Sequence, residues 1–213
     1  MKNSPRLIIF DFDGVLADSF DTFYPLIRDA MKHIGLPLTS DQYQNFFVDN
    51  VHQSFKNYIN NESNYLSFSK FRQDNYDKYY YNKNSVKLFT GALEFLKNMS
   101  KNYIITIASS GKQDNIKNLL SSNGVETLFG LILADSAHTK EGMIKEILNK
   151  YALEPQEAAM ITDTVGDIRV AKKIGLRTIA VTWGFHSAKM LESEKPDYLA
   201  NSFKMLYKYL KAF

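Results

Sequence analysis

The chain has 213 residues, of which 45% are hydrophobic and 23% charged, enough for one sizeable core and a small second lobe. Its formal net charge of +3 comes from Lys and Arg residues spread among acids, so no nucleic-acid partner is expected. The lack of cysteine excludes a disulfide framework, a thiolate nucleophile and a cysteine metal site. The apolar run near the N-terminus is too short for a signal sequence or a membrane span, and we expect a cytoplasmic protein.

The first predicted strand ends in closely spaced acids. Residues 7–10 are wholly apolar, and Asp11, Asp13 and Asp18 follow them in the sequence LIIFDFDGVLADS. Side chains two residues apart in a strand point to the same face, so Asp11 and Asp13 are expected to converge. Two carboxylates this close repel each other unless a cation, a shared proton or water relieves them.

No buried strand is predicted between about residues 19 and 87. This interval contains amphipathic pieces rich in Phe and Tyr, such as LIRDAMKHIG and DQYQNFFVDNVHQSFKNYI. Pro25 indicates that the first helix starts or kinks near that residue, after a non-helical link over 17–24. The pattern predicts an all-helical insertion, which either covers the strand ends as a lid or only packs against the core.

In the rest of the chain, short apolar runs alternate with helical stretches. These runs lie at 103–109, 130–135, 158–163 and 177–183, with a weaker one at 197–200. The alternation predicts parallel strands buried on both faces, in an α/β fold with a Rossmann-like sheet. We expect a core domain over 1–16 and 88–213 and a helical cap domain over 17–87. Sheets of this kind bind ligands at the carboxyl ends of their strands, and Asp11, Ser109, Asp135 and Asp163 all fall there.

Four short motifs in fixed order resemble the haloacid dehalogenase superfamily of phosphoryl-transfer hydrolases. They are DFDGV, ASSGK, HTKEGM and TDTVGD, and together they extend the resemblance over essentially the whole chain. Within that superfamily the chain resembles the branch of phosphoglycolate phosphatases and β-phosphoglucomutases that carry a helical cap. An acid two residues after the first Asp is typical of the phosphatases and phosphomutases of that family, and Asp13 supplies it.

The resemblance implies a role for each motif residue. Asp11 would be the nucleophile that forms an aspartyl-phosphate, and Asp13 the general acid and base. Ser109, with Ser110 and Gly111, would bind the phosphoryl oxygens. Lys140 would stabilise their charge; as a cation in the first turn of a helix it costs about 0.3–1 kcal/mol unless an anion is near. Lys145 and Lys112 are alternatives for this lysine.

The acids of the first and last motifs imply a magnesium ion. Asp11, the backbone carbonyl of Asp13 and Asp163 would hold Mg²⁺, since the donors are oxygens and the substrate is a phosphate. Asp167 would orient a metal-bound water or Lys140 without binding the metal itself. Many relatives have Gly where this chain has Thr162, and we expect a changed local contact there rather than lost catalysis.

The leading hypothesis is a Mg²⁺-dependent phosphatase that acts on a small phosphorylated metabolite, similar to phosphoglycolate phosphatases. A sugar phosphomutase of the same superfamily and a non-catalytic phospho-acceptor or binding protein are the alternatives. We expect a small phosphate ester as the partner, with no nucleic acid and no membrane. The sequence leaves the oligomeric state open, a monomer included. The histidines show no metal-ligand spacing, and structural or surface roles are expected for each: His33, His52, His138 and His186.

Overall fold

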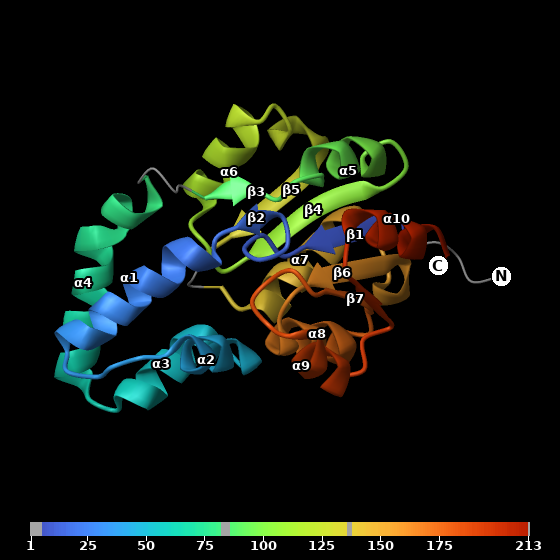
Figure 1. Ribbon diagram of the computed structural model, residues 1–213. Coiled ribbons are helices and arrows are strands. Elements are labelled where there is room, and N and C mark those ends of the chain that lie inside the picture. Colours follow the sequence, from blue (N-terminus) through green and yellow to red (C-terminus); the bar gives the residue numbers. More distant parts are fainter. Residues whose placement is uncertain (1–5, 82–85, 136–137, 213) are drawn as a thin grey trace. The chain divides into compact units, whose positions relative to one another are not determined.

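The computed structural model describes residues 6–81, 86–135 and 138–212 and divides the chain into two compact units (Figure 1). The larger unit is formed by Met1–Ala17 and Leu88–Phe213, and the smaller one by Asp18–Lys87. The chain leaves the larger unit in β2 (Ala17–Asp18) and returns to it in β3 (Lys87–Leu88), and these two short strands pair with each other.

The larger unit is built on a six-stranded sheet, in which neighbouring strands are parallel. This finding confirms the predicted α/β fold with a Rossmann-like parallel sheet. In spatial order the strands are β5 (Phe129–Ala134), β4 (Ile104–Ser109), β1 (Leu7–Phe10), β6 (Ala158–Thr162), β7 (Arg177–Val181) and β8 (Tyr198–Ala200). The helices of this unit are α5 (Ala92–Met99), α6 (Gln113–Ser122), α7 (Lys140–Tyr151), α8 (Val165–Ile174), α9 (Ala188–Ser193) and α10 (Phe203–Ala212).

The central strand β1 is fully buried because helices cover the sheet on both faces (Figure 1). Leu7 and Ile9 belong to an apolar cluster with side chains of α7 and α8. The alternate residue Phe10 faces the other way, and its ring meets Phe95 of α5 edge-on at 6.1 Å between centroids. Phe95 in turn lies 5.2 Å from Phe203 of α10. Burial on both faces explains why the sequence of this strand is apolar at every position.

The smaller unit is helical. Its main helices are α1 (Phe20–His33), α2 (Ser40–Asn45), α3 (Val51–Ile59) and α4 (Glu62–Tyr80). Helix α4 packs against both α1 and α3. A hydrogen bond of 2.6 Å from the Tyr79 hydroxyl to Asp29 joins α4 to α1, and the rings of Phe55 and Phe68 join α3 to α4 at 5.3 Å.

The expected start of the first helix near Pro25 is wrong. Helix α1 begins at Phe20, and Pro25 lies inside it. The proline removes one backbone donor from the helix. Packing outweighs this loss, because Leu26, Ile27 and two further residues of α1 are buried as an apolar stripe. A helix therefore replaces most of the non-helical link that was expected over 17–24.

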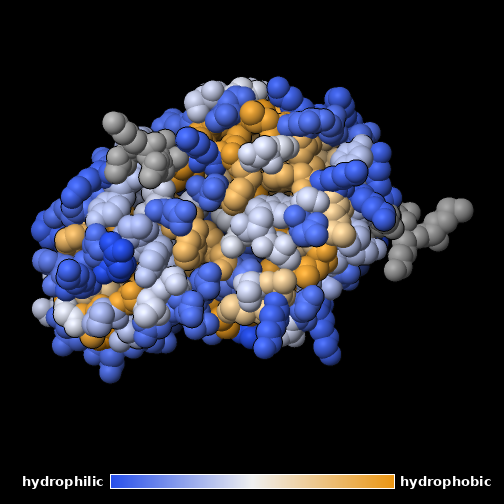
Figure 2. Space-filling model, viewed as in Figure 1, coloured by the Kyte–Doolittle hydropathy of each residue, from blue (hydrophilic) through white to orange (hydrophobic). Residues whose placement is uncertain are grey.

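Most of the surface drawn in Figure 2 is hydrophilic, with hydrophobic residues in separate patches. Within the described ranges, no helix is both long enough and apolar enough to cross a membrane.

Candidate active site

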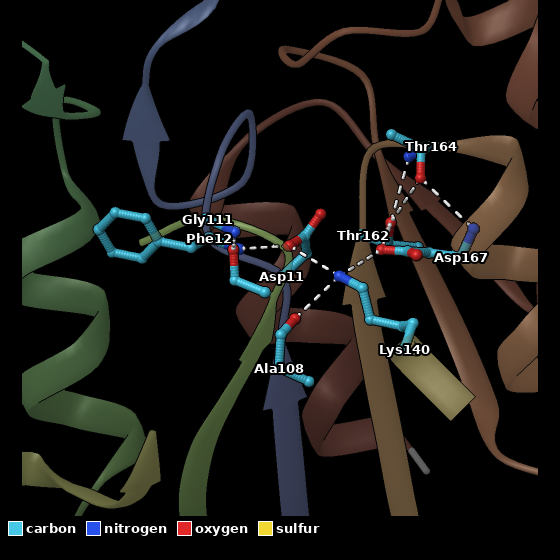
Figure 3. Close-up of polar contacts among 9 residues, drawn as sticks. Asp11, Phe12, Ala108, Gly111, Lys140, Thr162, Thr164 and Asp167 are labelled. Carbon is cyan, nitrogen blue, oxygen red and sulfur yellow. Dashed lines mark hydrogen bonds and ion pairs between the residues drawn. The ribbon is translucent and has the colours of Figure 1, made fainter. Parts of the chain in front are cut away.

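Three strand ends bring most of the motif residues together at one edge of the sheet. Asp11 follows β1, Ser109 is the last residue of β4, and Asp163 follows β6. Strand β1 lies between β4 and β6, with Phe10 in register with Ile107 on one side and Ile161 on the other. Because parallel strands end at the same edge, the topology itself assembles the site (Figure 3).

The two carboxylate oxygens of Asp11 have different surroundings. Oδ1 accepts hydrogen bonds from the Phe12 backbone N–H at 2.8 Å and from Lys140 Nζ at 2.9 Å. Oδ2 accepts none from the described residues. The side chain is buried, and this burial raises the pKa of Asp11 to about 7, although Lys140 acts in the opposite direction. One oxygen is thus fixed in place, and the other is left for a ligand.

Lys140 lies between two carboxylates, as Figure 3 shows. It is the first residue of α7, and its Nζ contacts Asp11 Oδ1 and Asp167 Oδ2 at 2.9 Å each. It also donates to the Ala108 carbonyl at 2.8 Å. Burial alone would lower the pKa of Lys140, but the charges of Asp11 and Asp167 outweigh it and raise the pKa above its usual value. The lysine is therefore held charged and relieves part of the repulsion expected among the acids.

These contacts use all three N–H donors of Lys140, so a phosphoryl oxygen could bind it only by replacing one of them. The two alternative lysines lie elsewhere. Lys145 is an exposed residue of α7 that pairs with Glu141 at 2.8 Å, and Lys112 is exposed at the N-cap of α6.

Asp163 is fully buried, and its two oxygens also differ. Oδ2 accepts a hydrogen bond of 2.7 Å from the Phe185 backbone N–H. Oδ1 is buried, and no described residue forms a hydrogen bond with it. Burial, reinforced by the nearby charge of Asp11, raises the pKa of Asp163 well above its usual range. A buried carboxylate oxygen without a partner is costly, and a bound cation would remove that cost.

Two glycines leave the room that Asp163 needs. A Cβ on Gly14 would lie 2.0 Å from Asp163 Oδ2, and Gly14 has a φ of +76°. A Cβ on Gly184 would lie 2.3 Å from the same oxygen and 2.5 Å from the Gly14 carbonyl. Any side chain at either position would displace the carboxylate. The sequence analysis did not identify Gly184 as a residue of the site.

His186 fixes the segment that carries Asp163. Its Nδ1 accepts a hydrogen bond of 2.9 Å from the backbone N–H of Val165, the first residue of α8. Its own backbone N–H donates to the Asp163 carbonyl at 3.3 Å. His186 therefore stabilises the turn from Asp163 to Val165. This is a structural role, and the sequence alone does not show which segment the histidine contacts.

Thr162 makes contacts that a glycine there could not make. Its hydroxyl accepts a hydrogen bond of 3.1 Å from the Thr164 backbone N–H and donates to Asp167 Oδ2 at 3.3 Å (Figure 3). Thr164 in turn is the N-cap of α8 and accepts from the Asp167 backbone N–H at 3.4 Å. The changed local contact expected at this position is thus the hydrogen bond from Thr162 to Asp167, the acid that pairs with Lys140. We call this hydrogen bond the clamp on Asp167.

The remaining motif residues lie around the loop after β4. Ser109 is buried, and its hydroxyl accepts a hydrogen bond of 3.1 Å from the Gly111 backbone N–H. Asp13 is close by, because a Cβ on Gly111 would come within 3.1 Å of Asp13 Oδ2. Ser110 is exposed. The structure thus gathers Asp11, Asp13, Ser109 and Gly111 at one edge of the sheet.

The arrangement of the acidic side chains shows which of them could bind a metal ion. In the described part of the chain, no three His, Cys, Asp or Glu side chains gather as a metal cluster. Asp167 is held by Lys140, which leaves the carboxylates of Asp11 and Asp163 and any backbone carbonyl beside them. The partnerless Asp163 Oδ1 and the purely oxygen character of these donors fit a hard divalent cation such as Mg²⁺.

Comparison with known proteins agrees with this architecture. The model of the haloacid dehalogenase-like hydrolase family matches residues 8–181, and the chain belongs to that family, which confirms the predicted resemblance. A phosphoglycolate phosphatase of Synechococcus elongatus is 25% identical over 91% of this chain and 92% of its own. The pyrophosphatase PpaX of Oceanobacillus iheyensis is 23% identical over 94% of each chain. A haloacid dehalogenase-like family hydrolase of Streptococcus pneumoniae shares the fold with a TM-score of 0.83, at 24% identity over 97% of this chain and 98% of its own.

Proposed function

We propose that this protein is a Mg²⁺-dependent phosphatase that hydrolyses a small phosphorylated metabolite through an aspartyl-phosphate on Asp11. The observation that carries the proposal is the pairing of buried Asp11 with Lys140, beside a second buried carboxylate, Asp163, that has an oxygen without a partner. Relatives named phosphoglycolate phosphatase and pyrophosphatase support phosphate-ester or phosphoanhydride hydrolysis. Phosphoglycolate is the first substrate to try.

In the first half of the reaction Asp11 attacks phosphorus. Oδ1 is already bound to the Phe12 N–H and to Lys140, so Oδ2 is the attacking oxygen. The bond from phosphorus to the ester oxygen breaks, and Asp13 gives a proton to the leaving alkoxide. Ser109 and the Gly111 N–H would bind the phosphoryl oxygens, and for this they would give up the hydrogen bond that they make to each other.

In the second half Asp13 acts as a base. It takes a proton from the water that attacks phosphorus, the bond from phosphorus to Asp11 Oδ2 breaks, and free phosphate leaves. Asp13 therefore has to hold a proton in one step and accept one in the next. Its position beside Ser109 and Gly111, where the phosphoryl group would bind, suits both steps.

Asp11, the backbone carbonyl of Asp13 and Asp163 would hold the magnesium ion. When bound, Mg²⁺ supplies positive charge that keeps both carboxylates ionised and draws charge from the phosphoryl oxygens. Lys140 adds a fixed positive charge on the other side of Asp11, and Asp167 with Thr162 holds that lysine in place.

The helical unit Asp18–Lys87 is assigned as a cap that excludes water and selects small substrates. Its support is its insertion between β2 and β3, directly after the loop that carries Asp11 and Asp13. An enclosing cap is suited to a metabolite, since a polymer could not be enclosed.

Turnover of p-nitrophenyl phosphate with Mg²⁺ and with EDTA tests the activity. We expect EDTA to abolish turnover and Asp13→Asn to lower kcat by at least about 100-fold. Acid-quenched enzyme should carry phosphate on Asp11, and Asp11→Asn should carry none. Unchanged turnover in Asp13→Asn would overturn the enzymatic assignment and favour a phospho-acceptor.

A phosphatase and a sugar phosphomutase differ in the group that receives the phosphate from phosphorylated Asp11. Phosphoenzyme that loses its phosphate to water at the same rate with and without sugar phosphates is a hydrolase. Transfer to a sugar phosphate faster than to water would overturn the phosphatase assignment.

A further inference from the structure

Arg72 in the helical unit is a cation without a matching anion. Three of the four other arginines, Arg6, Arg28 and Arg169, each pair with a carboxylate at 3.3 Å or less. Arg72 pairs with none of the described carboxylates, and its Nε is buried without a hydrogen-bond partner. A buried N–H without an acceptor is energetically unfavourable, and an added acceptor that binds this arginine would remove the cost.

Aromatic rings hold the Arg72 guanidinium in place. It lies 5.3 Å from the ring centre of Phe68, four residues earlier on α4, and 5.7 Å from that of Phe55 on α3. The two rings also contact each other at 5.3 Å. Rings can hold the planar cation by their faces, but they cannot accept its N–H groups as a carboxylate or phosphate would.

His52 provides a second buried nitrogen without a partner. His52 lies three residues before Phe55, on the same side of α3, and its Nε2 is also buried without a partner. The ring of Phe55 lies 5.7 Å from the Arg72 guanidinium, so His52 is one helical turn from a residue that Arg72 contacts. Burial lowers the pKa of His52, and the positive charge of Arg72 lowers it further. Two buried nitrogens on adjacent helices, one of them on a charged group, therefore have no hydrogen-bond partner among the described residues.

We propose that Arg72 and His52 form an oxyanion-binding site between α3 and α4, which takes a phosphate or carboxylate group. The guanidinium would bind two oxygens side-on through Nε and one terminal nitrogen, and His52, in the tautomer with the proton on Nε2, would donate a further bond. The site lies wholly within the helical unit and is distinct from the phosphoryl site at the sheet edge. It does not depend on the proposed reaction.

The test is a titration of the ¹⁵N-labelled full chain in EDTA, at constant ionic strength, with inorganic phosphate in one series and acetate in the other. Backbone amides of α3 and α4 should shift and saturate with at least one of the two ions, and the tighter ion identifies the chemistry. Amides of Ser109–Gly111 report separately on phosphate at the sheet edge, so binding there is not mistaken for this site.

Arg72→Met should weaken saturation at α3 and α4 at least tenfold. Arg28→Met is the matched control, because it removes the same charge from the same unit, and it should bind the ion as the wild type does. His52→Gln gives a second measure, with affinity lowered about threefold or more. An absence of saturable shifts with both ions, or equal affinity in Arg72→Met and wild type, would overturn the site.

Discussion

Lys140 is the residue on which the electrostatics of the sheet edge depends. It pairs with Asp11 and Asp167 from the first turn of α7, where a cation is otherwise unfavourable. The two carboxylates compensate for this unfavourable position, and the lysine in turn keeps them apart from each other. The ion pairs are buried, so the loss of one partner leaves charges that water cannot solvate.

Lys140→Met should therefore affect both stability and activity. We expect the free energy of unfolding in urea to fall by about 3 kcal/mol, because Asp11 and Asp167 lose their shared partner. We expect kcat to fall at least about 100-fold. Lys145→Met is the control on the same helix; its exposed pair should cost at most about 1 kcal/mol and leave kcat unchanged. Equal effects of the two variants would contradict the account.

Thr162→Val tests the clamp on Asp167. The variant keeps the shape of the side chain but removes the bond to Asp167 and the acceptor for the Thr164 N–H. Stability should fall by about 1–2 kcal/mol, and kcat should fall several-fold because Asp167 no longer holds Lys140 firmly. Thr106→Val removes a similar buried hydroxyl, bonded to the Ile8 carbonyl at 3.2 Å within the sheet, and should change stability alone. A Thr162→Val enzyme with the kcat of wild type would show that the clamp has no catalytic effect.

At the scale of elements, Glu141 links α7 to α8. It contacts Lys145 of its own helix and Lys173 of α8 at 2.8 Å each. Hydrogen bonds from both lysines lower the pKa of Glu141 to about 2. A carboxyl group whose pKa is lower in the folded state contributes stability above its unfolded pKa of about 4.5 and loses that contribution as the pH falls toward 2.

Glu141→Gln should thus lower the melting temperature slightly at neutral pH, and the difference from wild type should shrink as the pH falls from about 5 to about 3. The sign follows from the lowered pKa: the charged form is the stabilising one, and wild type also loses it in acid. Glu146→Gln, exposed on the same helix, is the control and should show no such trend. A difference that grows in acid would contradict the assignment.

The elements differ in how well the sequence predicts them. The strands could be predicted because burial on both faces demands apolar residues throughout, and strand ends at one edge then place Asp11, Ser109 and Asp163 together. Helix α1 could not be placed from Pro25, since its buried stripe decides the outcome. The roles of Gly184 and His186 could not be predicted, because the loop that carries them contacts Asp163 only once the chain has folded. A glycine after a strand was the one signal available in the sequence.

At the scale of the whole molecule, each unit carries buried polar atoms without partners. Among the described residues, the sheet edge has a carboxylate oxygen without a donor, in Asp163, and helices α3 and α4 have two nitrogens without a partner, in Arg72 and His52. The first is suited to a cation and the second to an anion. The domain boundaries and the cap role stay predictions, as do the roles of the site residues.

The central claim is that a divalent cation satisfies the buried carboxylates at the sheet edge, and thermal unfolding with and without Mg²⁺ measures it directly. Mg²⁺ that binds only the folded state should raise the melting temperature of wild type. Asp163→Asn should lose this increase and be at least as stable as wild type without metal, because a buried charge is gone. Asp114→Asn, in the first turn of α6, should keep the increase. A wild type that gains nothing from Mg²⁺, or an Asp163→Asn variant that gains as much as wild type, would contradict the account.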